Sequence, residues 1–373
     1  MSAVVHEKRR VAILINDMNA AGGIQRVAAN LVRDLQPWYR TMLLAVEPLR
    51  APVFCEPELD FRSLNCQRVS SSRLMLLREL FVAGRRLRRF VVEKKIDTVL
   101  AIWYDMASVA AFAVPRPVRK VGCEHMSYWQ ATRTWRWIRS RSYPRLDAVV
   151  ALTVEDLPLL AGISRSARVI PNYVHAVQPA PMERREKILL TVGHLERRKG
   201  IDRLLWGLKQ ALLDHPDWKL VVVGGGEKGH ADWNYLDYVS TLIQLLQLQG
   251  RVEFHPATSR IDDWYRRASI YVLGSRREGL PMVLIEAKAH GLPIVSFDCP
   301  SGPKEIVRNG VDGYLIENDS LEFGEAAGAL MSDADLRRRM SAAALEDARL
   351  RFSPASILPQ WCELIESLHE RGN

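Results

Sequence analysis

The feature that most constrains this chain is the alternation of short apolar runs with helical patterns along both of its halves. In the first half the apolar runs cover residues 11–15, 41–46, 98–103, 120–123, 148–152 and 168–172. In the second half they cover residues 188–192, 220–223, 252–254, 270–273, 294–297 and 313–316. Strands that alternate with helices form parallel sheets covered on both faces. The sequence therefore predicts an α/β protein with two tandem Rossmann-like domains.

The domain boundaries follow from this repeat and from the length of 373 residues, which exceeds one comfortable core. A Pro-Asn pair at residues 171 and 172 marks a break. We expect an N-terminal domain over residues 1–172, a linker over 173–185, a C-terminal domain over 186–350 and a final helical segment over 351–373. Ligands bind at the carboxyl ends of the strands in such sheets, so we expect the site in a central cleft between the two domains.

Two carboxylates, Glu278 and Glu286, follow the apolar run 270–273 at a spacing of eight residues. A strand, a sharp turn and a helix start in that order offer free backbone N–H groups to an anion such as phosphate. The backbone expected to line this pocket belongs to Gly279, Leu280, Pro281, Met282 and Val283. Carboxylates repel phosphate, so they are expected to hold hydroxyl groups, one of a sugar and one of a ribose. This pattern indicates a nucleotide-sugar site, and the alternative is an ordinary βα unit with solvated glutamates.

The string E-G-L-P at 278–281, with E-A at 286–287 and G-L-P-I-V at 291–295, resembles the E-x7-E region of retaining GT-B glycosyltransferases of family 4. The most similar group is that of bacterial surface-polysaccharide enzymes. The resemblance implies a GT-B fold whose final helix, here within 351–373, crosses back to the N-terminal domain. It also implies that Glu278 acts at the transferred sugar and that Glu286 binds the ribose.

Two glycine-rich loops are candidates for binding the donor diphosphate. Residues 193–200 (G-H-L-E-R-R-K-G) resemble a family motif in which an Arg and a Lys grip the donor phosphates. Lys199 matches that motif, whereas His194 stands where Arg is usual, so Arg198 or its neighbour Arg197 has to supply the guanidinium. Gly22 and Gly23 follow the first strand; glycines permit close backbone approach and positive φ, and the family carries a similar loop facing the diphosphate.

Two further stretches resemble family motifs. Glu124 and His125 follow the run 120–123 and look like the family's E-H pair, in which the histidine lies near the donor sugar and the acceptor. A structural histidine is the alternative. Residues 298–306 (D-C-P-S-G-P-K-E-I) resemble the loop of members that use UDP-activated hexoses, which implies a UDP-sugar donor.

Basic and aromatic side chains gather in two N-terminal stretches of a chain whose net charge is +9. Residues 73–95 hold eight Lys or Arg against two glutamates, and residues 129–145 hold five Arg and three Trp without an acid. Arginine beside tryptophan suits the surface of an anionic membrane, and nucleic acid is the rival partner, although no nucleic-acid-binding motif is evident. The residues predicted to face the membrane or acceptor are Arg85, Arg86, Arg88, Arg89, Trp135, Arg136, Trp137 and Arg139.

The remaining signals concern compartment and cofactors. Five scattered cysteines without a C-x-x-C pair predict reduced thiols in the cytosol. No run is long and apolar enough to span a bilayer, so a peripheral protein on the inner face of the cell membrane is predicted. No histidines stand at ligand spacing, so neither a metal nor another cofactor is expected. The favoured function is metal-independent hexose transfer from a UDP-sugar to a lipid-linked saccharide, without a nucleic-acid partner. The alternatives are a catalytically weak nucleotide-sugar-binding scaffold and a UDP-sugar 2-epimerase.

Overall fold

The computed structural model describes residues 7–20, 22–50, 54, 56, 58–67, 73–224 and 233–370. By its internal contacts the chain divides into two compact units. The first consists of Met1–Asn172 together with Ile357–Asn373, and the second of Tyr173–Ser356.

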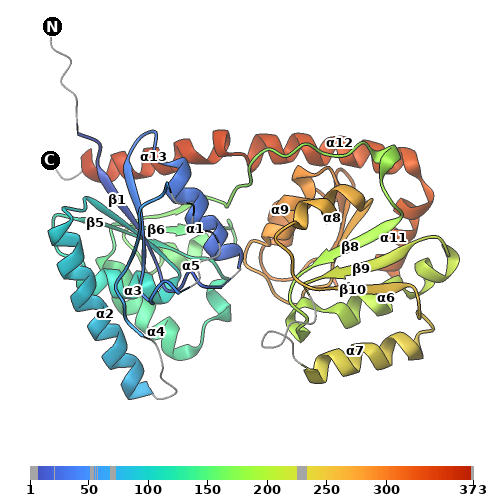
Figure 1. The fold of residues 1–373 in the computed structure, drawn as a ribbon, viewed down its shortest axis with the longest axis horizontal. Helices are drawn as coiled ribbons and strands as arrows, with labels where there is room; N and C mark the ends of the chain where they lie inside the picture. Colours follow the sequence, from blue (N-terminus) through green and yellow to red (C-terminus); the bar gives the residue numbers. More distant parts are fainter. Residues whose placement is uncertain are drawn as a thin grey trace, which may run out of the picture. The chain divides into compact units, whose positions relative to one another are not determined.

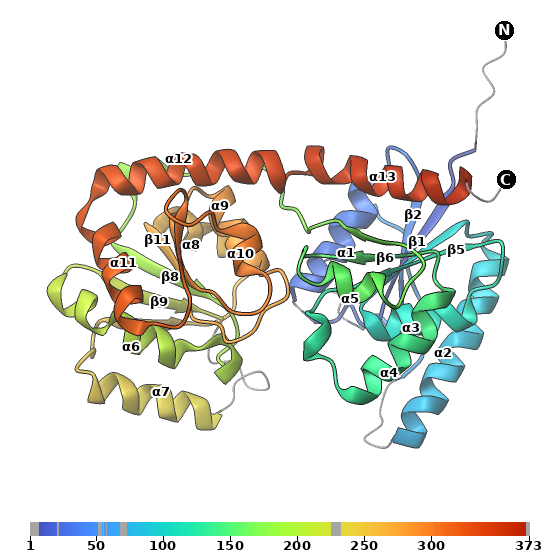
Figure 2. The same ribbon diagram turned by 180° about the vertical axis from the view of Figure 1, so that it is seen from behind.

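The first unit is a parallel sheet with strand order β3-β2-β1-β4-β5-β6-β7. Its strands are β1 (Arg10–Ile15), β2 (Arg40–Ala45), β3 (Phe61–Ser63), β4 (Thr98–Ile102), β5 (Arg119–Cys123), β6 (Ala148–Ala151) and β7 (Ala167–Val169). Its helices are α1 (Gly23–Asp34), α2 (Arg73–Glu93), α3 (Tyr104–Ala113), α4 (Arg133–Ser142), α5 (Leu157–Ala161) and most of α13 (Pro354–Glu370). Helices α2, α3 and α4 cover one face of the sheet, and α1 and α13 lie on the other (Figures 1 and 2).

The second unit is a parallel sheet with strand order β10-β9-β8-β11-β12-β13. Its strands are β8 (Ile188–Val192), β9 (Lys219–Val223), β10 (Val252–His255), β11 (Ile270–Leu273), β12 (Ile294–Phe297) and β13 (Gly313–Ile316). Its helices are α6 (Ile201–Asp214), α7 (Trp233–Leu245), α8 (Ile261–Arg267), α9 (Met282–Ala289), α10 (Pro303–Ile306), α11 (Ser320–Ser332) and α12 (Ala334–Arg351). Helices α8 and α9 lie over one face of the sheet, and α6 and α7 over the other (Figure 1).

The continuous apolar runs of the sequence have a direct cause in this layering. Every residue of β4, β6, β11 and β12 is buried, because helices exclude water from both faces of each sheet. The prediction of an α/β protein with two Rossmann-like domains is confirmed. Strand β3 was not predicted, since its three residues are only partly apolar and none of them is buried. Strand β7 lies at 167–169 and not at the predicted 168–172.

The segment 173–185, predicted as a linker, packs with the second unit. The N–H of Val174 donates to the carbonyl of Phe352 at 2.9 Å. Arg185 is buried, and within the described part of the chain its guanidinium donates only to backbone carbonyls, those of Ala180, Tyr265, Ala268 and His290. Since a buried guanidinium needs all its donors satisfied, Arg185 fixes the end of this segment against the C-terminal ends of α8 and α9.

Helix α13 is part of the first unit, although it follows the second unit in the sequence. Glu366 accepts a hydrogen bond from the hydroxyl of Tyr39 at 2.9 Å and pairs with Arg9. The ring of His369 lies 2.9 Å from the hydroxyl of Thr98 on β4. Among the described residues, no helix has the length and apolar character needed to cross a bilayer.

Candidate functional site

The candidate site of the second unit lies where the strand order reverses. Strand β8 pairs with β9 on one side and with β11 on the other. The chain leaves β8 toward β9 and later returns to the opposite side of β8 as β11. The loops after β8 and β11 therefore diverge at the carboxyl edge of the sheet, which is where ligands bind in open α/β sheets.

Two glycines hold these loops together. Gly200, which ends the 3-10 turn Arg197–Lys199, has φ +65° and lies back to back with Gly274. A Cβ at Gly200 would lie 2.0 Å from the carbonyl oxygen of Gly274, and a Cβ at Gly274 would lie 2.3 Å from that of Gly200. Any side chain at either position would push the loops apart, so the absence of side chains sets their separation.

Side chains of the two loops contact one another at Glu278, a residue that is 7% exposed. Its Oε1 accepts from Lys199 Nζ at 2.7 Å and from Ser275 Oγ at 2.7 Å. Its Oε2 lies 3.5 Å from Arg198 Nη1. The carboxylate predicted to hold sugar hydroxyls thus contacts both cations predicted to bind the diphosphate.

The structure distinguishes the two arginines that were candidates to compensate for His194. Arg198 is shared between Glu278 and Glu196, whose Oε1 lies 2.6 Å from Arg198 Nη2. Arg197 is exposed, and it is the backbone carbonyl of Arg197 that is engaged, by Arg276. His194 is exposed earlier in the same loop, between β8 and the turn Arg197–Lys199. Arg198 is therefore the guanidinium that joins Lys199 at Glu278.

Helix α9 begins at Met282, immediately after Pro281, as the strand-turn-helix pattern predicted. No described side chain caps it, and the N–H of Leu284 donates to the carbonyl of Pro281 at 3.0 Å, so the N–H groups of Met282 and Val283 are the ones left available to an anion. Glu286 stands one turn further along, and its Oε2 accepts from the hydroxyl of Tyr265 at 2.9 Å. This helix therefore carries both an anion-binding end and a carboxylate held in a fixed orientation.

The loop after β12, which carries the D-C-P-S-G-P string, supports Glu278 through its backbone. The N–H of Glu278 donates to the carbonyl of Pro300 at 3.0 Å, and the N–H of Ser301 donates to the carbonyl of Glu278 at 3.1 Å. A Cβ on Gly302 would lie 1.9 Å from the carbonyl oxygen of Gly279. A glycine is required there for the two loops to approach this closely.

A buried ion cluster fixes the far end of α9. Lys288 is fully buried, and its ammonium donates to Asp312 at 2.9 Å, to Asp347 on α12 and to the carbonyl of Ile306 at 2.7 Å. Breaking such a cluster would leave an uncompensated buried charge. This cluster could not be predicted from the sequence, because its acidic members lie 24 and 59 residues from Lys288.

In the first unit, Gly22 and Gly23 follow β1, whose neighbours β2 and β4 place this loop at the reversal of the first sheet. Gly22 has φ −117°, an extended conformation that other residues also adopt, so this position does not use the positive φ that glycine permits. A Cβ there would lie 2.4 Å from Gln25 Oε1, the end of a flexible side chain that can move aside, so space does not require glycine at this position either. Helix α1 begins at Gly23 without a side-chain cap.

His125 and Glu124 follow β5, and their environments differ. Glu124 is buried and accepts from Arg139 Nη1 at 2.9 Å and from the hydroxyl of Tyr143. The imidazole of His125 is only partly exposed and makes no hydrogen bond within the described part of the chain. Burial lowers the pKa of His125 to about 4, so this imidazole is neutral near pH 7.

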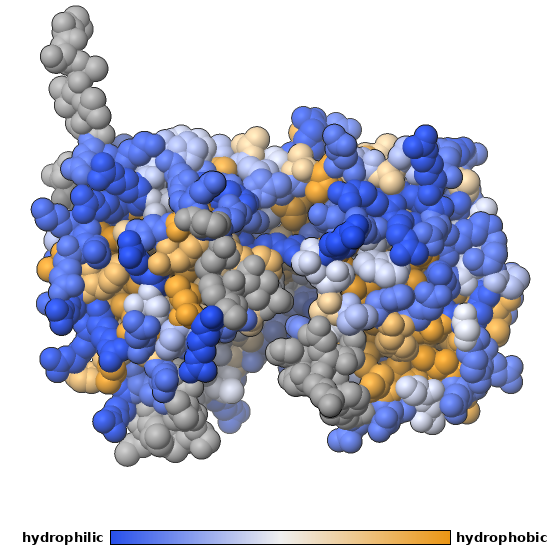
Figure 3. Space-filling model, in the orientation of Figure 1, coloured by the Kyte–Doolittle hydropathy of each residue, from blue (hydrophilic) through white to orange (hydrophobic). Residues whose placement is uncertain are grey.

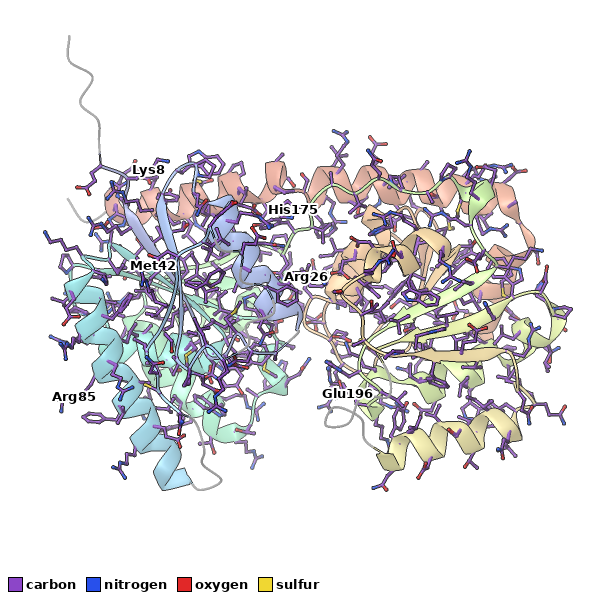
Figure 4. All side chains as sticks on the ribbon, in the orientation of Figure 1. Lys8, Arg26, Met42, Arg85, His175 and Glu196 are labelled. Atoms are coloured by element: carbon purple, nitrogen blue, oxygen red, sulfur yellow. The ribbon has the colours of Figure 1, made fainter. Side chains whose placement is uncertain are left out.

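The predicted membrane-facing residues fall into three groups: buried, half-buried and exposed. Arg139 was wrongly assigned, because it is 0% exposed and lies between the rings of Tyr104 and Tyr128 while pairing with Glu124. Trp135 is half-buried against Tyr104, with ring centroids 4.9 Å apart, and Arg136 is half-buried. The exposed members are Arg85, Arg86, Arg88, Arg89 and Trp137. Figure 4 shows Arg85 on the outer side of α2.

Two of these exposed arginines already have partners. The Nη1 of Arg86 donates to the carbonyls of Leu64 and Asn65, each at 2.7 Å. Arg89 pairs with Glu93 at 2.6 Å. Across the described residues, no group of three or more His, Cys, Asp or Glu side chains is placed to hold a metal ion.

Comparison with known proteins agrees with this geometry. Residues 177–347 match the family model Glycosyl transferases group 1. An uncharacterized glycosyltransferase of Haemophilus influenzae is 28% identical over 343 residues, which cover 89% of this chain and 93% of the relative. The amylovoran biosynthesis glycosyltransferase AmsD of Erwinia amylovora is 28% identical over 374 residues, covering 95% and 99%.

Solved structures show the same fold. The crystal structure of Anabaena Alr3699/HepE in complex with UDP and glucose aligns with a TM-score of 0.77 at 19% identity, covering 97% of this chain and 100% of that one. The chain has the GT-B fold, with two parallel-sheet Rossmann-like domains. The matched domain and the relatives support a GT-B glycosyltransferase.

Proposed function

We propose that this protein is a retaining, metal-independent glycosyltransferase that moves a hexose from a UDP-sugar to a lipid-linked saccharide during the synthesis of a surface polysaccharide. The observation that carries the proposal is the meeting of Lys199, Arg198 and Glu278 beside the uncapped start of α9. Two cations and a helix N-terminus make an anion site, and a carboxylate within reach of it is a hydroxyl acceptor.

Different residues of the second unit are proposed to bind different parts of the donor. The diphosphate binds Lys199, Arg198 and the backbone amides of Met282 and Val283 at the start of α9, and Glu286 accepts from the ribose hydroxyls. Glu278 leaves its cation partners to accept from a hydroxyl of the transferred sugar. The positive charges of the cations and of the helix N-terminus stabilise the negative charge that develops on the departing UDP. A metal ion performs this task in other transferases.

In the proposed reaction, the bond between the anomeric carbon and the β-phosphate oxygen breaks, and the acceptor oxygen bonds to the same face of that carbon. The acceptor's proton passes to the departing phosphate, so no protein nucleophile is needed. His125 is proposed to act on the sugar as a neutral hydrogen-bonding group, consistent with the low pKa that its burial causes.

Two relatives support the substrates. The Anabaena protein with the same fold is described in complex with UDP and glucose, which supports a UDP-hexose donor. The Erwinia relative is named for amylovoran biosynthesis, which supports a saccharide acceptor. The D-C-P-S-G-P loop that supports Glu278 is the feature of this chain that favours UDP.

A basic, partly apolar surface on the first unit supports an anionic membrane as the place where a lipid-linked acceptor is met. On α2, Phe81 and Val92 are exposed alongside Arg85 and Arg88. Figure 3 shows hydrophobic residues among hydrophilic ones over α2, at the left of the view. On α4, Trp137 is 61% exposed with the guanidinium of Arg141 over its ring. Aromatic and arginine side chains together suit the interface of an anionic bilayer.

The proposal is tested by incubating the purified protein with UDP-hexoses and a lipid-linked saccharide extract in EDTA, and by following UDP release. Transfer with retention of the anomeric configuration, read by NMR of the product, is the expected result. Binding of UDP, GDP and ADP is compared by thermal shift, since a ligand at 100 times its Kd stabilises by about 2.7 kcal/mol. A preference for GDP would refute the UDP assignment, and UDP binding without any turnover would favour a scaffold.

A further inference from the structure

Arg276 joins the two loops of the donor site through four hydrogen bonds. Its backbone N–H donates to the carbonyl of Arg198 at 2.8 Å, and its Nη1 donates to the carbonyl of Arg197 at 2.7 Å. The same guanidinium pairs with both oxygens of Asp202, at 2.9 and 2.7 Å. Arg276 lies on the loop after β11, whereas all three of its partners lie on the loop after β8 or in the first turn of α6.

Asp202 is itself anchored from a third element. The hydroxyl of Tyr235, on α7, donates to Asp202 Oδ1 at 2.7 Å and accepts from the N–H of Asp202 at 3.1 Å. Asp202 and Tyr235 are both buried. Although burial opposes ionisation, the hydrogen bonds from Arg276 and Tyr235 hold the pKa of Asp202 below its usual range. The carboxylate that Arg276 grips is therefore a charged and rigid anchor.

We propose that Arg276 is a positioning residue of the donor site, which holds the turn Arg197–Lys199 so that Arg198 and Lys199 present their charges to the diphosphate of the nucleotide. This inference rests on the proposed function, because it assigns a role in binding the same donor. Arg276 does not itself contact the diphosphate in this scheme. It fixes the backbone from which the two binding cations extend, and a preorganised site binds more tightly than one that must be ordered by its ligand.

The guanidinium is suited to this task in a way that an ammonium is not. Its planar fork donates at once to the carbonyl of Arg197 and, side by side, to both oxygens of Asp202. A lysine would keep the charge but would lose this simultaneous geometry. Charge and positioning can therefore be separated by comparing Arg276→Ala with Arg276→Lys.

The experiment measures the Kd of UDP by calorimetry and the Kd of uridine by ligand-observed NMR for four proteins. They are the wild type, Arg276→Ala, Arg276→Lys and the control Arg277→Ala. Arg277 is the adjacent residue; it is exposed, and its side chain contacts no described residue through a hydrogen bond or ion pair. We expect both Arg276 variants to weaken UDP binding about tenfold, because misplaced cations bind the diphosphate poorly. The Kd of uridine should change less than twofold, and Arg277→Ala should match the wild type.

Each other result has a defined meaning. Equal losses for UDP and uridine, or full recovery of UDP binding in Arg276→Lys, would overturn the positioning role while leaving the proposed function standing. Failure of the wild type to bind UDP would overturn the proposed donor and the inference with it. If the Arg276 variants do not fold, Tyr235→Phe removes only the hydroxyl that anchors Asp202. It should raise the Kd of UDP more than the Kd of uridine. An unchanged ratio of the two Kd values would overturn the inference.

Discussion

Lys199 Nζ lies 2.7 Å from Glu278 Oε1, although 79 residues separate the two in the sequence. The ammonium proposed to bind the donor diphosphate is thereby neutralised by the carboxylate proposed to bind the transferred sugar. A diphosphate that reaches Lys199 has to compete with Glu278 for the same charge. Donor binding is therefore an exchange of partners at Lys199.

Replacing Glu278 with Gln should tighten UDP binding while it slows transfer. The change removes the competing charge at Lys199 and the repulsion between carboxylate and phosphate, so we expect the Kd of UDP to fall about fivefold. Turnover of the UDP-sugar should fall about 100-fold because the sugar is no longer held in place. Calorimetry and UDP release measure the two effects. Glu196→Gln removes a negative charge that pairs with Arg198 and not with Lys199, and this control should retain turnover. Weaker UDP binding by Glu278→Gln would refute the exchange.

Replacing Glu286 with Ala should weaken the binding of UDP and of uridine alike, by about 10-fold or more. Both ligands carry the ribose, whose hydroxyls are proposed to donate hydrogen bonds to the Glu286 carboxylate. Calorimetry and NMR provide the two dissociation constants. Glu325→Ala, at an exposed position of α11, should leave both unchanged. A loss confined to UDP would move Glu286 from the ribose to the diphosphate end of the donor.

Replacing His125 with Asn should reduce the loss of stability on acidification. The pKa of His125 is about 4 in the folded protein, below its ordinary value of 6.5, so the unfolded chain binds the proton more tightly. The stability that this difference provides is complete above about pH 6.5 and is lost as the pH falls toward 4. Thermal unfolding midpoints measured from pH 7.5 to 4 should fall less steeply for the variant. Parallel curves for variant and wild type would contradict the low pKa.

Removing exposed arginines from α2 should weaken binding to anionic vesicles. Arg85 and Arg88 have no ion-pair partner among the described residues, and each basic residue near such a surface is worth about 1 kcal/mol. We expect about a fivefold loss for either single Ala variant in sedimentation with phosphatidylserine vesicles, and little binding of any form to neutral vesicles. Trp137→Ala should also weaken binding. Trp206→Ala, which removes a tryptophan that is 50% exposed on the second unit, should not. Equal binding by all variants would refute this surface.

The sequence predicted those parts of the molecule that depend on local pattern. The ranges predicted for β8, β11, β12 and β13 match the structure, because buried strands leave continuous apolar runs between turn residues. The start of α9 was predicted from another local pattern, a strand followed by a Gly/Pro turn and a helical segment. The residues proposed as the donor site were recognised from a family resemblance, and their roles stay predictions.

Contacts between distant residues could not be predicted. Arg276 and Asp202, which share a two-pronged ion pair, lie 74 residues apart in the sequence. Nothing in the sequence distinguishes Arg276 from its neighbour Arg277. Arg139 was assigned to the surface because it stands among exposed arginines and tryptophans, yet its position on α4 directs it to Glu124. Ser275 and Tyr265, which hold the two glutamates, are ordinary residues whose role depends on tertiary packing.

The place of α13 in the first unit has a consequence for how the protein is made. A ribosome synthesises Met1–Asn172 first, then the whole of the second unit, and only then the helix whose Glu366 and His369 contact Tyr39 and Thr98. The N-terminal half therefore emerges with the surface for α13 uncovered and stays so until the whole second unit has been synthesised. A chaperone that protects the nascent chain would therefore have to stay longest on the half that is made first.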